Sequence, residues 1–203
     1  MDVKKCNVLA AEIRLETLKV IHSRGFGHVG GSMDLADLMA VLYGEVMKFD
    51  PKNPRWEDRD WLVLSKGHAG PVAYATFGLM GFYPMEEAYT LNQPHTKFPS
   101  HTDRKLTPGV DLTTGSLGQG ASTAAGAALG NKIDGHDVQA IYDAIQNAYA
   151  KKGVPSCIVL DTCKGKGATF AEPKHDHSSQ PTEEQWAEAI AASEKALEAV
   201  KNA

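Results

Sequence analysis

A short apolar run that leads into a glycine turn and then a helix constrains the fold more than any other part of the chain. Trp61-Leu-Val-Leu-Ser65 is nearly continuous in apolar residues, which is typical of a strand buried on both faces of a parallel sheet. Lys66-Gly-His68-Ala-Gly70 follows as a tight connection, and Pro71 suits the first turn of a helix. This order predicts an α/β fold in which His68 lies near the carboxyl end of a strand, the edge where open α/β sheets bind ligands.

Helices outnumber strands in the rest of the chain. Apolar spacing predicts helices at 7–23 and 137–152, a helix capped by Asp34, and a final helix from a capping box at Thr182 and Gln185 to about 201. Only 155–160 matches a second buried strand, and 133–136 is predicted to be a turn. Because a typical sheet has ~5 strands, we expect helices around a depleted, mostly parallel sheet. The 203 residues should form one domain, 1–203, with a helical C-terminal extension from about 182.

The stretch Thr113-Thr-Gly-Ser-Leu-Gly-Gln-Gly120 is a candidate ligand-binding turn. Its glycines leave backbone N–H groups unobstructed, and the alanine-rich run 121–129 is predicted to begin a helix there. Such a turn presents N–H donors and the positive end of the helix dipole to a phosphate or another electron-rich group. The spacing matches neither the dinucleotide fingerprint nor a Walker A loop. A tight turn that only packs a small-residue helix therefore remains the alternative.

Histidines occupy several loops. Four glycines surround His28 in the segment 23–31, His101 lies in the irregular segment 97–103, and His177 lies in the polar loop 173–181. Imidazole can donate to a developing alkoxide and transfer protons near neutral pH. Without further context each of these residues fits a turn as well as a catalytic role. His136 is expected to serve the turn before a helix, and His22 and His95 match no functional pattern.

Composition excludes several functional classes. A formal net charge of −4 with no basic stripe argues against nucleic-acid binding, and no run approaches the ~20 apolar residues of a membrane span. The 3 cysteines have no zinc-like spacing, so they are expected to be reduced thiols. A cytoplasmic protein without a membrane partner is the expectation.

Five motifs occur in the order found in one enzyme family. Taken together they resemble the N-terminal half of transketolases, in two blocks at about 7–132 and 133–190. The chain looks like the N-terminal subunit of a split transketolase, whose diphosphate-binding and pyrimidine-binding domains are separate polypeptides. The motifs are Gly27-His28-Val-Gly-Gly31, Leu64-Ser-Lys-Gly-His68, Ser100-His101, Thr113 to Gly120, and Thr162-Cys-Lys-Gly-Lys-Gly167.

The resemblance implies a thiamine-diphosphate enzyme that transfers a two-carbon ketol unit between sugar phosphates. His28 and His101 would face the donor sugar and the reacting carbanion, and His68 would lie by the cofactor diphosphate, so these three are the expected catalytic histidines. His177 would close the substrate channel. Gly115, Leu117 and Gly118 would lie at the aminopyrimidine and thiazolium of the cofactor. The family glutamate that activates the cofactor belongs to the pyrimidine-binding half, so a C-terminal partner subunit is also implied.

One family element is missing from the sequence. Transketolases bind magnesium and the diphosphate through a Gly-Asp-Gly motif and a later asparagine, on a βαβ segment that follows the Gly-Gln-Gly helix. Here Lys132 runs directly into Ile133-Asp-Gly-His136, which resembles the sequence that follows this segment in the family. A βαβ unit takes ~30 residues. The resemblance therefore implies a truncated thiamine-diphosphate-binding fold with no metal site in this chain.

Three consequences are expected from that loss. The chain alone should bind thiamine diphosphate and magnesium very weakly or not at all, because the charge of the diphosphate lacks its compensating cation. A sheet that has lost interior strands should expose apolar edges and form a homo-oligomer. The chain is then either an impaired transketolase subunit that needs its partner, or a non-catalytic structural or regulatory relative. Sequencing the encoding DNA would show whether the loss is natural.

Overall fold

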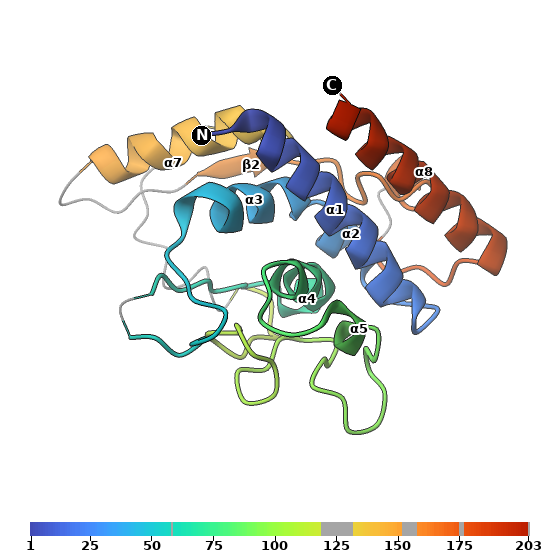
Figure 1. Cartoon of the computed structure of the whole chain (residues 1–203). Coiled ribbons are helices and arrows are strands. Elements are labelled where there is room, and N and C mark those ends of the chain that lie inside the picture. Colours follow the sequence, from blue (N-terminus) through green and yellow to red (C-terminus); the bar gives the residue numbers. More distant parts are fainter. Residues whose placement is uncertain (58, 119–131, 152–157, 175–176, 203) are drawn as a thin grey trace.

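The computed structural model describes residues 1–57, 59–118, 132–151, 158–174 and 177–202. Helices are the main regular structure in this part, with a small parallel sheet at one end (Figure 1). The α-helices are α1 (Val3–His22), α2 (Val29–Met33), α3 (Ala36–Val41), α4 (Gly70–Leu79), α5 (Met85–Ala88), α7 (Val138–Ala150) and α8 (Glu183–Asn202). The strands are β1 (Lys132–Asp134) and β2 (Val159–Asp161), and the short helical turns are η1 (Leu42–Val46), η2 (Gly67–Ala69) and η3 (Glu172–Lys174).

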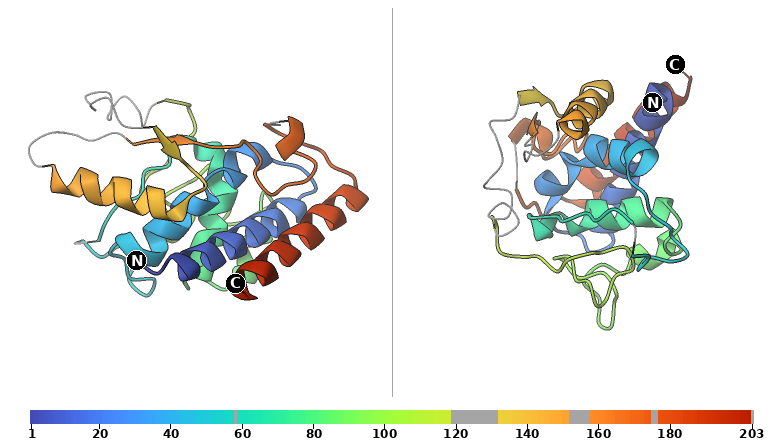
Figure 2. Two further views of the ribbon diagram at one scale, coloured as in Figure 1. Left: turned by 90° about the horizontal axis from the view of Figure 1, so that it is seen from above. Right: turned by 90° about the vertical axis from the view of Figure 1, so that its left-hand side faces the viewer.

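Helix α1 is the element around which the other helices pack. The Asp2 carboxylate caps its first turn by accepting the Lys5 amide at 3.0 Å, and the helix ends shortly before Gly25, whose φ is +79°. The helix expected at 7–23 is therefore confirmed and begins earlier. Helix α8 lies antiparallel along one side of α1, while α3 and α4 contact its other side (Figures 1 and 2).

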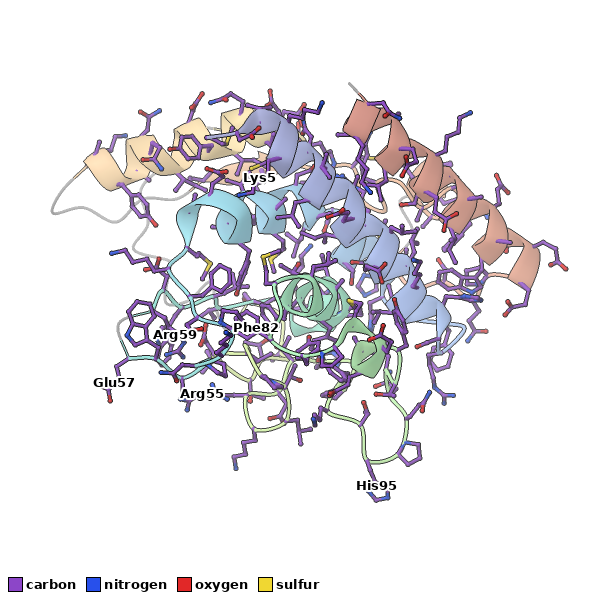
Figure 3. The ribbon with its side chains drawn as sticks, in the orientation of Figure 1. Lys5, Arg55, Glu57, Arg59, Phe82 and His95 are labelled. Atoms are coloured by element: carbon purple, nitrogen blue, oxygen red, sulfur yellow. The ribbon has the colours of Figure 1, made fainter. Side chains whose placement is uncertain are left out.

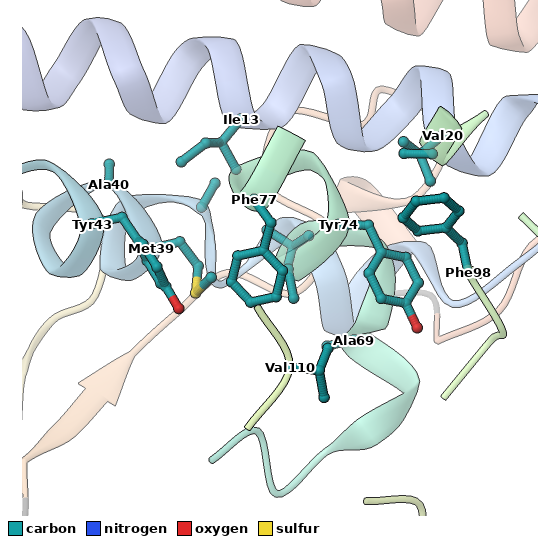
Figure 4. Close-up of a cluster of buried hydrophobic side chains, with 14 of the residues drawn as sticks. Ile13, Val20, Met39, Ala40, Tyr43, Ala69, Tyr74, Phe77, Phe98 and Val110 are labelled. Carbon is teal, nitrogen blue, oxygen red and sulfur yellow. The ribbon is translucent and has the colours of Figure 1, made fainter. Parts of the chain in front are cut away.

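The largest apolar core lies between α1, α3 and α4. Ile13 of α1, Met39 of α3 and Phe77 of α4 are buried there, and Phe98 and Val110 from irregular segments complete it (Figure 4). Two tyrosine hydroxyls in this core have partners: Tyr74 donates to the Pro99 carbonyl at 2.6 Å and Tyr83 donates to the Tyr74 carbonyl at 2.9 Å. The core thus fixes α4 and the loop that follows it relative to α1.

Strands β1 and β2 pair in parallel, with Ile133 opposite Leu160 and Asp134 opposite Asp161. The sheet and α7 lie at one side of the molecule, opposite α5 (Figures 1 and 2). The expectation that 133–136 is entirely a turn is wrong, because the chain enters β1 first and turns only at Gly135 and His136. Helix α7 begins as expected, with the Asp137 carboxylate accepting the amides of Gln139 and Ala140.

The segment 61–65, expected to be a buried strand, forms no strand in the structure. Leu62 and Leu64 pack against the main core, but Trp61 is 55% exposed and Val63 is 43% exposed. Side chains take the place of a neighbouring strand: the Asp111 carboxylate accepts the Leu62 amide at 2.9 Å, and the Thr114 hydroxyl donates to the Leu64 carbonyl at 2.6 Å. His68 consequently lies in η2 and not at the end of a strand.

An ion pair holds Asp111 in that position. Arg59 contacts the Asp111 carboxylate, and its Nε lies 3.1 Å from Oδ1, with both side chains buried. Figure 3 shows Arg59 beside Arg55 and Glu57 at one edge of the molecule, while His95 projects from a distant loop into solvent. The exposed position of His95 agrees with the absence of any motif around it.

Two further expectations about helix ends have different outcomes. Asp34 does not cap a helix; it follows α2, and its carboxylate pairs with the Lys66 ammonium at 2.6 Å. The capping box of α8 is present, since the Thr182 amide donates to the Gln185 side chain at 2.9 Å and the Thr182 hydroxyl accepts the Gln185 amide at 3.4 Å. Within the described ranges, no helix is long and apolar enough to span a bilayer.

Candidate active site

Four histidines from distant parts of the sequence come together in the structure. The His28 ring centroid lies 5.1 Å from that of His68, 5.7 Å from that of His101 and 5.4 Å from that of His177. The His68 and His177 centroids are 4.9 Å apart. The four residues that the sequence singled out in separate loops thus form one group, which we call the histidine cluster.

Backbone pairing brings His177 to His28. Gly27 and Ser179 form an antiparallel bridge, with the Gly27 amide 3.4 Å from the Ser179 carbonyl and the Ser179 amide 3.3 Å from the Gly27 carbonyl. A glycine at 27 suits this place, because a Cβ there would lie 2.9 Å from the Ile21 side chain. The bridge holds the loop of His177 against the turn that precedes α2.

His68 is held from two sides. It is 7% exposed and lies in η2, the turn that opens α4, while Gly31 of α2 leaves room for its ring. A Cβ on Gly31 would lie 2.7 Å from His68 Nε2. Gly67 likewise packs so closely on the Thr114 carbonyl that no side chain fits. Gly31 and Gly67 therefore allow close packing around His68 as well as turn formation.

Hydrogen bonds between three loops place His101 and Gly115 at the same site. The Thr102 amide donates to the Gly67 carbonyl at 3.3 Å, and the Thr114 amide donates to the Thr102 carbonyl at 3.3 Å. The hydroxyls of Thr102 and Thr114 lie 3.0 Å apart. As a result, a Cβ built on Gly115 would lie 3.7 Å from the His101 ring, so this part of the predicted glycine turn does border the histidine cluster.

Burial and mutual repulsion keep the inner imidazoles neutral. Desolvation lowers the pKa of His68 most, and with smaller contributions from His28, His177, Lys66 and His101, in that order, brings it to about 4. Desolvation also lowers the pKa of His28, with contributions from His177 and His101. Neutral rings at pH 7 can each donate one hydrogen bond and accept another, which suits recognition of hydroxyl and carbonyl groups of a sugar.

The remaining cofactor residues expected from the resemblance lie toward the surface. Leu117 is 67% exposed, and Gly118 is exposed with φ at +89°. Gln119 and Gly120, and the helix expected at 121–129, lie outside the described residues. The structure therefore brings Gly115 to the histidine cluster and leaves Leu117 and Gly118 accessible.

The donor chemistry of the cluster distinguishes between ligands. Imidazoles and open backbone fit an organic ligand with hydroxyl groups or an aromatic ring, whereas magnesium prefers oxygen ligands. In the part of the chain that the structure describes, no three His, Cys, Asp or Glu side chains are arranged to hold a metal ion. The four imidazoles of the histidine cluster thus suit an organic ligand better than they suit a magnesium ion.

Sequence reasoning missed the contribution of Lys66 to this site. Its ammonium pairs with Asp34 and lowers the pKa of the adjacent His68. The residue is part of the Leu64-Ser-Lys-Gly-His68 motif, so its place in the sequence was visible. Its partner Asp34 could not be identified from the sequence, because Asp34 is distant in sequence and was expected to cap a helix.

Comparisons with known proteins identify the family. Residues 6–133 match the model of the transketolase, thiamine diphosphate binding domain. The 6-deoxy-6-sulfo-D-fructose transketolase subunit SqwG of Clostridium sp. (strain MSTE9) is 37% identical over 258 aligned positions, which cover 90% of this chain and 94% of that protein. Transketolase 1 of Escherichia coli (strain K12) is 39% identical over 64% of this chain, but the match spans only 21% of that enzyme.

Solved transketolases share the fold. The enzyme from Leishmania mexicana superposes on 100% of this chain and 45% of its own, with a TM-score of 0.79 at 21% identity. That from Campylobacter jejuni superposes on 99% of this chain and 47% of its own, with a TM-score of 0.78 at 24% identity. The chain therefore spans less than half the length of these solved relatives. With its α/β fold and the matched segment 6–133, this chain belongs to the family of transketolase thiamine-diphosphate-binding domains.

Proposed function

We propose that the chain is the N-terminal subunit of an enzyme that transfers a two-carbon ketol unit between sugars. The observation that carries this proposal is the histidine cluster, in which four imidazoles from separate loops of a transketolase-family domain converge within one site. A chain that had kept only the packing of the fold would not need four imidazoles together, two of them with lowered pKa values.

Each site residue has a proposed role. His28 and His101 donate hydrogen bonds to the oxygens of the donor sugar, and His68, the most buried of the group, lies toward the cofactor. His177 covers the sugar from its loop, while Gly115, Leu117 and Gly118 contact the organic part of the cofactor. Thiamine diphosphate, when bound, stabilises the carbanion through its thiazolium, and the protein contributes placement and electrostatics.

The proposed unit is one truncated diphosphate-binding domain over 1–203, with α8 as its C-terminal extension. Activity would require a separate C-terminal subunit that supplies the pyrimidine-binding half. The relative SqwG, which is named as a transketolase subunit and matches over nearly its whole length, supports this division of the enzyme. The reduced, fully buried thiol of Cys6 suits the cytoplasm, which we propose as its location.

We also propose that a cofactor-binding segment is missing between Lys132 and Ile133. The alignment with SqwG has 258 positions although this chain has only 203 residues, so it includes positions that this chain lacks. Without the Gly-Asp-Gly motif the chain alone should bind thiamine diphosphate and magnesium weakly. Calorimetric titration of the chain with both is the test, and micromolar affinity would refute the proposal.

Sugar phosphates are the proposed substrates. The name of SqwG assigns that relative to 6-deoxy-6-sulfo-D-fructose, and a sulfonate resembles a phosphate in charge and in oxygen acceptors. Ketose phosphates and the sulfonated ketose should therefore be compared as donors in the same assay. A higher kcat/KM for one of them identifies the preferred anionic group.

The decisive experiment combines the chain with a candidate C-terminal subunit, thiamine diphosphate, magnesium, and donor and acceptor sugars. Ketol transfer that is lost on His101→Asn but kept on His95→Asn supports catalysis, because His95 lies outside the cluster and Asn tolerates its positive φ of 63°. A stable complex without turnover supports the alternative, a non-catalytic structural or regulatory relative.

Self-association is proposed from the exposed segment 61–65. The side chains of Trp61 and Val63 are exposed to solvent, and exposed apolar side chains favour association between copies of the chain. Light scattering at increasing concentration should show a homodimer, and a strictly monomeric profile would contradict this part of the proposal.

A further inference from the structure

A series of polar side chains joins the two blocks of the chain. The Arg14 guanidinium of α1 contacts the Asp37 carboxylate of α3. Asp37 Oδ2 lies 2.8 Å from Nδ1 of His136, in the turn after β1, and His136 Nε2 lies 2.7 Å from the backbone nitrogen of Cys163, just after β2. All three side chains are largely buried, so the series replaces water as the partner of each group.

The direction of these hydrogen bonds fixes the state of the His136 ring. A backbone amide can only donate, so His136 Nε2 must present its lone pair to Cys163. The ring proton is then on Nδ1, from which it is donated to Asp37. Asp37 Oδ2 also accepts from Arg14, whose guanidinium compensates the negative charge of the carboxylate. The geometry therefore requires a neutral imidazole in the Nδ1–H tautomer.

Cys163 begins the segment that carries His177. We call residues 163–174 and 177–179 the His177 limb. Near its start Gly167 packs on Arg14, since a Cβ at Gly167 would lie 3.2 Å from Arg14 Cδ. Its far end is held by the bridge between Ser179 and Gly27. The middle of the limb is held as well, because Ala168 and Ala171 are fully buried against α1 and α2. His136 therefore makes the attachment at the start of the limb, ahead of this core contact.

Hydrogen bonds and an ion pair within the limb join residues near its start to its middle. The Glu172 carboxylate accepts the Gly167 amide at 2.7 Å and pairs with the Lys166 ammonium at 3.6 Å. The start of the limb is therefore a hydrogen-bonded unit that leads into the core with α1 and α2. His177, whose ring lies beside those of His28 and His68, follows at the far end of the limb.

We propose that His136 is a positioning residue: through its Nδ1–H tautomer it fixes the His177 limb to α1 and α3 and thereby sets the place of His177 in the histidine cluster. The structural part of this proposal stands alone, and only its effect on turnover rests on the proposed function. His136 does not touch the cluster itself, so it acts through Cys163 and the limb.

The first test needs no substitution. Long-range proton–nitrogen NMR spectra of the unmodified chain should show His136 Nδ1 protonated and Nε2 as the acceptor at neutral pH. A proton on Nε2 would overturn the proposal, because the Cys163 amide would then face a second donor. This measurement can overturn the proposal even if every variant at position 136 fails to fold.

The second test uses two variants and a control. His136→Phe keeps an aromatic ring but removes both nitrogens, His136→Gln can still donate and accept, and His95→Asn changes an exposed histidine. Hydrogen exchange at the Cys163 amide should become at least about tenfold faster in His136→Phe, with an intermediate value in His136→Gln and no change in the control. The ring-proton resonances of His177, assigned with His177→Asn, should shift in the same order.

A folded His136→Phe with native exchange at Cys163 and unshifted His177 resonances would overturn the proposal. With the partner subunit and cofactor present, His136→Phe should raise the KM for the donor sugar about tenfold, with a smaller change in kcat. If the unmodified chain shows no ketol transfer, the proposed function fails, while the exchange and resonance measurements still decide the role of His136.

Discussion

Acidification from pH 6.5 to 4 should destabilise the folded chain through His68. In the unfolded chain this imidazole has an ordinary pKa of 6.5, whereas in the folded chain burial and the neighbouring His28, His177, Lys66 and His101 lower its pKa to about 4. Between these values the unfolded chain binds a proton that the folded chain excludes. Because the unfolded state binds more protons there, stability must fall as the pH falls through this window.

The magnitude follows from the two pKa values. Each tenfold change in proton affinity is worth ~1.4 kcal/mol, so lowering the pKa from 6.5 to about 4 makes the total loss about 3 kcal/mol. Above pH 6.5 the ring is neutral in both states and contributes no dependence on pH. Burial also lowers the pKa of His28 from its ordinary value of 6.5, so His28 adds to the loss of folding stability as the pH falls below that value.

The assay is urea unfolding at intervals from pH 7.5 to 4, for the native chain and for His68→Gln, which cannot take up a proton. The free energy of unfolding of the native chain should fall more steeply with acidification than that of the variant. The difference between the two slopes removes the contribution of carboxylates, which both proteins share. An NMR titration of the His68 ring supplies an independent measurement of its pKa.

Two results would refute this reasoning. One is an NMR titration in which His68 takes up its proton near pH 6.5 while the chain remains folded, since burial would then impose no cost on its charge. The other is a free energy difference between the native chain and His68→Gln that stays constant from pH 7 to 4.

Three further predictions test the packing of the site and the fold. Gly31→Ala places a Cβ 2.7 Å from His68 Nε2 and should lower the free energy of unfolding by about 1–3 kcal/mol, as measured by urea unfolding; an unchanged midpoint would show that the ring is not confined there. Thr182→Ala removes the hydroxyl that accepts the Gln185 amide at the start of α8 and should cost about 1 kcal/mol, with Ser178→Ala, outside the capping box, as the matched control. Arg59→Met leaves the buried Asp111 carboxylate uncompensated and should cost about 3–5 kcal/mol, whereas the double variant with Asp111→Leu should recover part of that loss; equal losses would argue against the ion pair.

The helices could be predicted because their signals are local. Apolar spacing marked α1 and α7, a capping box marked the start of α8, and the structure confirms all three helices within a few residues. Tyr149 shows the limit of such signals: it continues the apolar period of Val138, Ile141 and Ile145 in α7, yet it is 56% exposed. The amphipathic period gives the direction of a face but not how far a neighbouring element covers it.

The strands were predicted less well because a strand requires a partner. The apolar run 61–65 has the composition of a buried strand, yet Asp111 and Thr114 take up its backbone groups in place of a neighbouring strand. The segment 133–136 looked like a turn, yet pairing with β2 makes its first residues a strand. Neither outcome could be predicted from the segment alone, since each depends on residues far away in the chain.

The sequence by itself determined α1, α7 and α8 and which histidines to examine, because propensity, capping and motif order act over a few neighbouring residues. Only the tertiary structure decided that His28, His68, His101 and His177 share one site and that His136 holds the limb of one of them. Burial sets whether an imidazole is charged, and contacts between distant loops set what it faces. Both are properties of the packed molecule, so no reading of single segments could supply them.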